Sequence, residues 1–222
     1  MSGLTIFVQV GGHWSAPAAR YYGESLRLLI QNLECSQGSK ASGDVLTANL
    51  LLSSFEMLEA HTHEHQRHLD GALTLIRVHG INSQGQKMDR VNFWIYVRHD
   101  ITIAIENESP LRLHPEKWEM DLDRHIGHLE EDGDIDVLSN RLLWLVARAI
   151  NLIYAADPPS SSGGLLQNIH GDAADWLERL PVSYQGVKYG QADDLGFSRK
   201  YFANPSAGEC ICIGIGAGQL DF

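Results

Sequence analysis

Hydrophobic residues recur three or four positions apart along most of the chain, a spacing that puts side chains on one face of an α-helix. The clearest stripe lies in residues 135–156 and consists of Leu138, Leu142, Leu145, Val146, Ala149 and Ile153. The same test predicts helices over residues 18–33, 44–60, 62–80, 88–106 and 135–156, and a shorter helix over 170–180. We therefore expect an all-α, multi-helix fold.

Residues that favour helix ends agree with these limits. Thr62 is a suitable N-cap for the third predicted helix, and Gly80 is the residue type that best tolerates the left-handed position after a helix. Pro158 and Pro159 end the fifth helix because proline cannot continue it.

Two parts of the chain lack a helical pattern. The Pro-, Ser- and Gly-rich residues 158–164 predict a flexible linker, placed near 157–168. Periodicity disappears after Pro181, and residues 210–218 alternate apolar with small residues in a way that fits neither a helix nor a packed strand. We therefore expect an irregular C-terminal segment.

Net charge restricts the partners of the chain. Its 222 residues include 17 Lys and Arg against 28 Asp and Glu, which gives a formal charge of −11. The basic residues are scattered, so the chain lacks the charge density that neutralises DNA phosphates. Residues 116–136 hold nine acidic and two basic residues; a solvated loop is the favoured interpretation, and an acidic activation segment is the alternative.

The cysteines and the apolar runs indicate a soluble intracellular protein. Cys35, Cys210 and Cys212 are too few and too widely spaced for a disulfide framework. No uncharged apolar run approaches the roughly 18 residues that a membrane-spanning helix needs. We therefore expect no membrane partner.

Potential metal ligands gather in one place. On a helix, His61, His65 and His68 share a face and could hold zinc, which suggests an α-helical metal-dependent enzyme as an alternative function. The metalloprotease arrangement fails because His63 and His68 are five positions apart rather than four. Exposed imidazoles with His68 partly packed are the favoured interpretation. No nucleotide-binding or nucleophile motif is present, and we expect no enzyme and no catalytic residue.

The most distinctive residues lie in the third and fourth predicted helices and just beyond them. They are His68, Gly71, Ala72, Ile76, Gly80, Trp94, Tyr96, Arg98, Asp100, Ala104, Pro110 and Trp118. In this order they resemble the fungal-specific transcription factor domain, the regulatory region of zinc-binuclear-cluster activators. Trp176 and Pro181 are similar to a later connection of that domain, whereas His99 stands where the family usually has Gln.

The resemblance covers roughly residues 16–207, between an N-terminal segment, 1–15, and an irregular tail, 208–222. It implies a nuclear regulatory domain that acts through protein partners or a small-molecule effector, and that could dimerise. The family's zinc belongs to a six-cysteine DNA-binding module, which this chain lacks, so we expect no cofactor and no direct nucleic-acid binding. We interpret residues 211–222 as a truncated or mis-spliced end, and expect the chain to be incompletely folded or to depend on a partner.

The motif in residues 94–100 also makes physical predictions. Trp94 and Arg98 are four positions apart, so the guanidinium could lie over the indole. Arg98 and Asp100 point about 200° apart on a helix and must find separate partners, which we expect on other helices. The favoured interpretation is that the motif residues fix helix packing; sensing an effector is the alternative.

Overall fold

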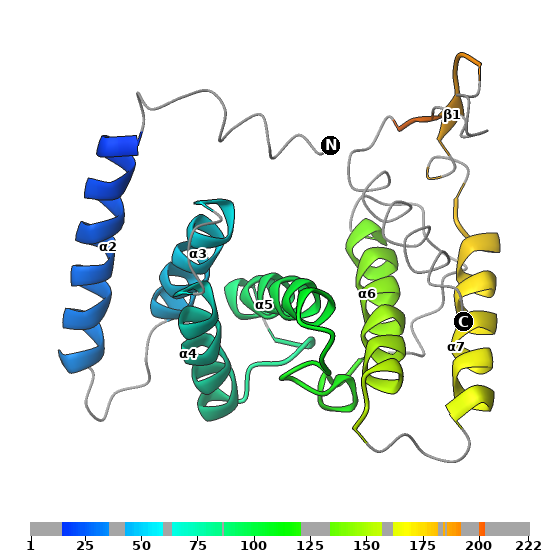
Figure 1. Cartoon of the computed structure of the whole chain (residues 1–222), viewed down its shortest axis with the longest axis horizontal. Helices are drawn as coiled ribbons and strands as arrows, with labels where there is room; N and C mark the ends of the chain where they lie inside the picture. Colours follow the sequence, from blue (N-terminus) through cyan, green and yellow to red (C-terminus); the bar gives the residue numbers. More distant parts are fainter. Residues whose placement is uncertain are drawn as a thin grey trace. The chain divides into compact units, whose positions relative to one another are not determined.

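The computed structural model describes residues 15–35, 43–59, 64–85, 87–120, 134–156, 162–181, 184, 186–191 and 200–202. Within these residues the chain forms six α-helices: α2 (Ser15–Cys35), α3 (Gly43–Glu59), α4 (Glu64–His79), α5 (Met88–Glu106), α6 (Asp134–Ile153) and α7 (Ser162–Glu178). A 3₁₀ turn, η1, spans Pro115–Lys117, and the two-residue strands β1 (Val187–Lys188) and β2 (Lys200–Tyr201) pair antiparallel. The all-α prediction is confirmed (Figure 1).

The helix limits follow the hydrophobic pattern closely. The predicted helix over 88–106 is α5 itself, and α4 ends at His79, where Gly80 adopts a φ of +63°. The amide of Ile81 then donates to the carbonyl of Ile76 at 3.0 Å, which closes the last turn and confirms Gly80 as the C-terminal cap. Thr62 lies outside the described residues.

One boundary differs from its prediction. Helix α7 begins at Ser162, so residues 162–168, expected to belong to a flexible linker, are helical. Gly163 and Gly164 occupy the exposed first turn, and Leu165, Leu166 and Ile169 then continue an apolar stripe that reaches the buried Trp176. The start of this helix was not predicted because the low helix propensity of the two glycines indicated a linker, although the apolar stripe begins just after them. Residues 157–161 and the tail 210–218 lie outside the described residues.

The chain divides into two compact units, which are described separately. Unit 1 comprises Met1–Ile103 and Arg112–Met120, and unit 2 comprises Ala104–Leu111 and Asp121–Phe222. None of the described helices is both long enough and apolar enough to span a membrane.

Unit 1 is built around the packing of α3 against α4, while α2 packs against α3 on the side away from α5 (Figure 1). Leu29 of α2 shares a buried cluster with Val45 and Leu52 of α3. The side-chain amide of Asn92 on α5 donates to Thr47 Oγ1 at 2.9 Å and to the carbonyl of Gly43 at 3.2 Å, which ties α5 to the start of α3.

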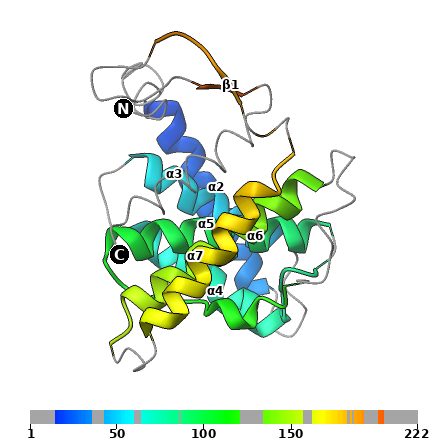
Figure 2. The ribbon, with the colours of Figure 1, turned by 90° about the vertical axis from the view of Figure 1, so that its right-hand side faces the viewer.

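In unit 2, α6 and α7 lie side by side (Figure 2). The predicted stripe of α6 is buried from Leu138 to Ala149, whereas Ile153 at its end is 37% exposed. The indole of Trp176 on α7 is buried and donates to the carbonyl of Leu138 at 3.1 Å, so α7 is fixed to α6 by a hydrogen bond as well as by apolar packing.

Candidate functional site

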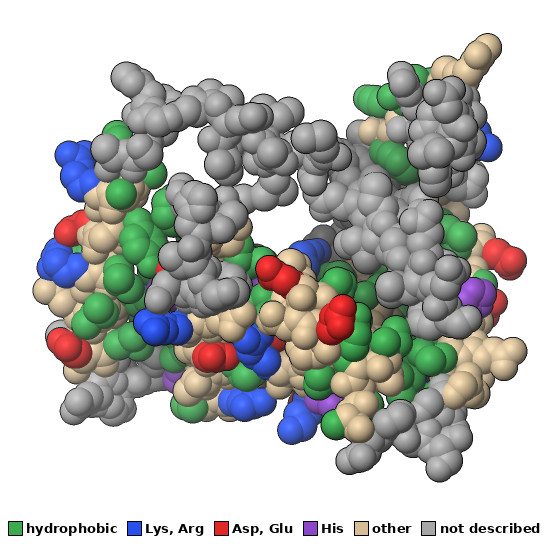
Figure 3. All heavy atoms as spheres, in the orientation of Figure 1, with side chains coloured by type: hydrophobic (Ala, Val, Ile, Leu, Met, Phe, Trp, Pro, Cys, Tyr) green, Lys and Arg blue, Asp and Glu red, His purple; other side chains and the backbone are tan. Residues whose placement is uncertain are grey.

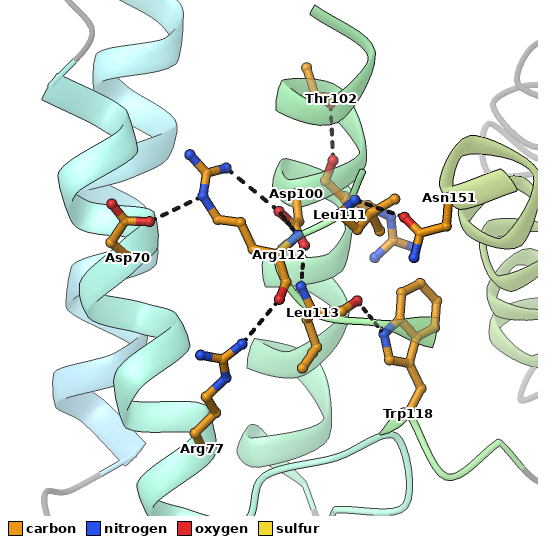
Figure 4. A network of polar contacts seen from close by, with 10 residues as sticks. Asp70, Arg77, Asp100, Thr102, Leu111, Arg112, Leu113, Trp118 and Asn151 are labelled. Atoms are coloured by element: carbon orange, nitrogen blue, oxygen red, sulfur yellow. Dashed lines mark hydrogen bonds and ion pairs between the residues drawn. The ribbon is translucent and has the colours of Figure 1, made fainter. Parts of the chain in front are cut away.

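Asp100 of α5 is the centre of a polar network in unit 1, although its side chain is only 1% exposed. Its two carboxylate oxygens accept the backbone amides of Leu113 at 3.0 Å and Arg112 at 3.3 Å (Figure 4). Nη1 of Arg112 lies 3.6 Å from the same carboxylate. A buried carboxylate is stable only when it is hydrogen-bonded and paired, and the segment after α5 supplies both.

Arg112 connects this network to α4. Its Nε lies 3.1 Å from Oδ1 of Asp70, and its backbone carbonyl accepts a hydrogen bond from Nη2 of Arg77 at 3.1 Å. Figure 4 shows the guanidinium of Arg112 between Asp70 and Asp100. The segment Arg112–Met120 is therefore held to both α4 and α5 by charged groups.

Burial dominates the electrostatics of the site. It raises the pKa of Asp100 above its ordinary value, while the two backbone amides and the Arg112 guanidinium act in the opposite direction. Burial also raises the pKa of Tyr96 far above that of free tyrosine, and the negative charge of Asp100 adds to this effect. The hydroxyl of Tyr96 is buried and has no hydrogen-bond partner within the described residues, so it stays a neutral phenol.

Aromatic packing fixes the end of the same segment. Trp118 is fully buried, and its indole N–H donates to the carbonyl of Leu113 at 3.1 Å. Its ring meets Trp94 and Phe93 edge to face, with centroid distances of 5.8 and 6.0 Å, and those two rings meet each other in the same way at 5.3 Å. The three rings form a core cluster in the geometry that aromatic quadrupoles favour.

Two predictions about Arg98 are wrong. Its guanidinium does not lie over Trp94; Nη1 donates instead to the backbone carbonyl of Trp94 at 3.3 Å, and the side chain is exposed. The contact found for Arg98 within the described residues is therefore with its own helix, and the rest of its guanidinium is open to water. Arg98 and Asp100 do use separate partners, but Asp100 binds the segment after its own helix rather than another helix.

His68 of α4 takes part in a second polar cluster. Its Nδ1 lies 2.8 Å from Oδ1 of Asn49, its backbone carbonyl accepts from Nδ2 of Asn49 at 2.6 Å, and its Nε2 lies 3.2 Å from Oε1 of Glu56. Glu56 also accepts a hydrogen bond from the hydroxyl of Tyr22. In this arrangement both ring nitrogens of His68 are occupied.

The structure does not favour the alternative interpretation of His61, His65 and His68 as a zinc-binding face. His61 and the side chain of His65 lie outside the described residues, and His68 already has partners on both nitrogens. Across the described part of the chain, no three His, Cys, Asp or Glu side chains lie close enough together to hold a metal ion.

The other motif residues are divided between the packed interior and the surface. Ala72, Ile76, Ala104 and Trp176 are buried, Pro110 is exposed and Pro181 is half-buried. A Cβ added to Gly71 would lie 3.5 Å from Nδ2 of Asn49, an ordinary contact that does not itself require glycine. The network around Asp100 brings together residues from α4, α5 and the segment after α5, but not these positions.

Sequence reasoning missed the residues that satisfy the motif. Arg112 is the one charged residue of the otherwise apolar segment Pro110–Leu113. That position could have marked it as the partner of a buried acid. Asn49, Ser53 and Glu56 are polar residues spaced four and three apart in α3, and all three are buried. A polar stripe at core spacing signals a buried hydrogen-bonded cluster.

The network around Asp100 holds structure in place. Both carboxylate oxygens of Asp100 are occupied by backbone amides, and the Arg112 guanidinium lies between two acids. Groups committed to one another in this way position a chain segment and do not present a free nucleophile or base.

Comparisons with known proteins identify the family. No curated protein and no solved structure matches the chain. The family model of the fungal specific transcription factor domain matches residues 5–177, a range that includes the Asp100 network, the His68 cluster and Trp176. With most of its length matched by that model, this chain belongs to the family of fungal specific transcription factor domains.

Proposed function

We propose that this chain is a regulatory helical domain of a fungal transcription factor that modulates transcription through contacts with protein partners or a small-molecule effector. The observation that carries the proposal is the family match over residues 5–177. The site agrees with it, because the motif residues near Asp100 serve packing and the anchoring of a segment. We further propose that the chain acts in the nucleus, without a cofactor and without catalysis.

Charge supports the proposal that the chain does not bind DNA directly. The formal charge is −11, and on the face shown in Figure 3 the Lys and Arg side chains are interspersed with Asp and Glu. Non-specific and specific binding both depend on neutralising phosphates, which this distribution does not favour. A gel shift at low salt should therefore give no discrete, sequence-dependent complex, and the appearance of one would contradict this part of the proposal.

A tethering experiment tests the regulatory role. Residues 1–222 are fused to an unrelated DNA-binding domain, and transcription of a reporter carrying its site is compared with that given by the DNA-binding domain alone in fungal cells. We expect the fusion to change reporter output severalfold in either direction. Unchanged output, with the fusion present in the nucleus at equal amount, would refute the proposal.

Two matched substitutions show whether the folded domain causes the effect. Trp94→Ala removes a side chain that is 6% exposed, whereas Val78→Ala removes one that is 72% exposed. The first should abolish the change in reporter output and the second should leave it intact. An unchanged effect in Trp94→Ala would mean that it does not depend on the packed core.

A metal-dependent enzyme is the competing function. The occupied nitrogens of His68 argue against it in this conformation. Elemental analysis of the purified chain separates the two, because stoichiometric zinc that is lost in a His61→Ala, His65→Ala double variant would favour the enzyme.

A further inference from the structure

The polar cluster around His68 connects three helices of unit 1. Tyr22 comes from α2, Asn49 and Glu56 from α3, and His68 from α4. The side chains of Glu56 and His68 are only 8% and 13% exposed. Because these groups are nearly out of reach of water, the position of each proton decides whether a contact attracts or repels.

The hydrogen bonds of Asn49 define the protonation of one ring nitrogen. Its amide nitrogen donates to the backbone carbonyl of His68 at 2.6 Å, so its oxygen is the atom that faces Nδ1 of His68 at 2.8 Å. An amide oxygen only accepts, and Nδ1 must therefore carry a hydrogen. In a neutral imidazole the other nitrogen, Nε2, then has only a lone pair.

That second nitrogen lies against a carboxylate. Nε2 of His68 is 3.2 Å from Oε1 of Glu56, a contact that attracts only when a proton lies between the two atoms. With this proton the pair is an imidazolium and a carboxylate of zero net charge. Without it, a lone pair faces a buried negative charge that has lost its counter-charge, which is strongly unfavourable.

Hydrogen bonds within the described residues satisfy only part of the Glu56 carboxylate. Oε2 of Glu56 is buried without a hydrogen-bond partner in the described residues, and Tyr22 supplies one neutral hydroxyl to Oε1. Tyr22 is the titratable group that faces the pair from α2. On α4, Asp70 binds Arg112, and on α5, Nε2 of His99 lies 3.1 Å from Oγ of Ser54 on α3.

Exposing Glu56 to water would relieve the repulsion, and α2 is the helix whose Tyr22 covers it. The hold of α2 on unit 1 is modest, since it packs chiefly on α3 and its Ile30 and Leu33 are 47% and 45% exposed. Stacking of Tyr22 on Phe55, with centroids 5.4 Å apart, and burial of Leu29 are its main apolar contacts.

We propose that Tyr22, Glu56 and His68 form a proton-dependent latch, which holds α2 against α3 while His68 is protonated and loosens it when that proton is lost. Histidine is the side chain that ordinarily changes charge between pH 5 and 8. The latch concerns the fold of unit 1 and does not depend on the proposed role in transcription.

Hydrogen exchange measured by mass spectrometry tests the latch in the full chain. Exchange rates of peptides from residues 18–33 are corrected for the intrinsic effect of pH and compared at pH 5.5 and pH 8. We expect the protection of α2 to fall by on the order of tenfold at the higher pH, since a closed state that binds one more proton than the open state loses stability as pH rises. Equal protection at the two values would overturn the proposal.

Two variants assign the effect to the pair. Glu56→Gln keeps the shape of the side chain but carries no charge, so the protection of α2 should no longer fall as pH rises. His170→Gln removes an exposed histidine on α7 and should keep the wild-type change. A wild-type pH change in Glu56→Gln, or its loss in His170→Gln, would contradict the assignment to Glu56 and His68.

A measurement on the unmodified chain decides the matter if Glu56→Gln does not fold. Nitrogen-15 NMR of the histidine rings should show both nitrogens of His68 protonated at pH 5.5. At pH 8 the neutral ring should carry its hydrogen on Nδ1, because Asn49 holds it there. A neutral ring protonated on Nε2 would show that the latch geometry is wrong.

Discussion

Replacing Trp118 with Ala should remove a large part of the stability of unit 1. Large-to-small changes of buried aromatic residues cost about 3–5 kcal/mol of unfolding free energy. Trp118 is 0% exposed, and its loss also leaves the Leu113 carbonyl without its 3.1 Å donor, which costs about 1 kcal/mol or more. The expected loss of about 4–6 kcal/mol compares with a total of about 5–15 kcal/mol for a typical domain.

A conservative variant separates the two contributions. Trp118→Phe keeps a ring against Phe93 and Trp94 but removes the N–H donor, so it should cost about 1–3 kcal/mol. Trp94→Ala alone should cost about 3–5 kcal/mol. The double variant with Trp118→Ala should lose about 0.5–1.5 kcal/mol less than the sum of the two single losses. The reason is that the edge-to-face contact between the two rings, with centroids 5.8 Å apart, can be lost only once.

Urea unfolding followed by far-ultraviolet circular dichroism measures these differences without relying on tryptophan emission. Trp144→Ala on α6 is the matched control: this ring is half-buried, with the Arg148 guanidinium 4.5 Å from its centroid, and its loss should cost clearly less. A cost below about 1 kcal/mol for Trp118→Ala would refute the inferred role of the cluster, since that is far under the range for core aromatics. So would a Trp118→Phe variant as unstable as Trp118→Ala.

Five further substitutions test three other features by the same unfolding assay. Asp100→Asn should destabilise unit 1 most in acid and less towards neutral pH. Folding raises the pKa of Asp100, so the stability that this residue contributes falls as pH rises through its titration. A difference in unfolding free energy between wild type and variant that is the same at every pH would contradict this. Gly80→Ala, at a φ of +63°, should cost about 1–2 kcal/mol, whereas Gly171→Ala at an exposed position of α7 should stabilise by about 0.5–1 kcal/mol; equal effects would contradict the capping role. Arg112→Met should cost about 1.5–3 kcal/mol by depriving buried Asp100 of its counter-charge, while Asp70→Asn, with a side chain 64% exposed, should change stability by about 1 kcal/mol at most; the reverse order would contradict the network.

Most of the helical architecture could be predicted from hydrophobic spacing. The limits of α5 and the glycine cap of α4 followed from local patterns, because burial and capping both act within a few residues of sequence. The start of α7 could not be predicted, because Gly163 and Gly164 are typical of a linker, whereas the stability of this first turn comes from the apolar residues after it. The prediction of one helical domain over 16–207 stays a prediction.

The candidate site was predicted only in part. Trp94, Asp100 and Trp118 were singled out, but their partners lie at other points of the chain: Arg112 follows Asp100 by twelve residues, and Asn49 precedes His68 by nineteen. Such pairings depend on tertiary packing and leave no periodic signal. The predicted stacking of Arg98 on Trp94 is wrong because helical spacing makes a contact possible without making it the preferred one, and the guanidinium donates to the Trp94 carbonyl instead.

The division of the chain into two units has a consequence for dissecting it. Because unit 2 includes Ala104–Leu111 while Arg112–Met120 belongs to unit 1, the polypeptide passes between the units three times, and neither unit is one continuous stretch. A cut after Met120 would leave unit 1 intact but would remove Leu111 from unit 2, where its amide donates to Oδ1 of Asn151 at 2.8 Å. A C-terminal fragment would thus lose a hydrogen bond and a buried leucine, so that fragment and whole chain would differ in stability even if unit 2 has a core of its own.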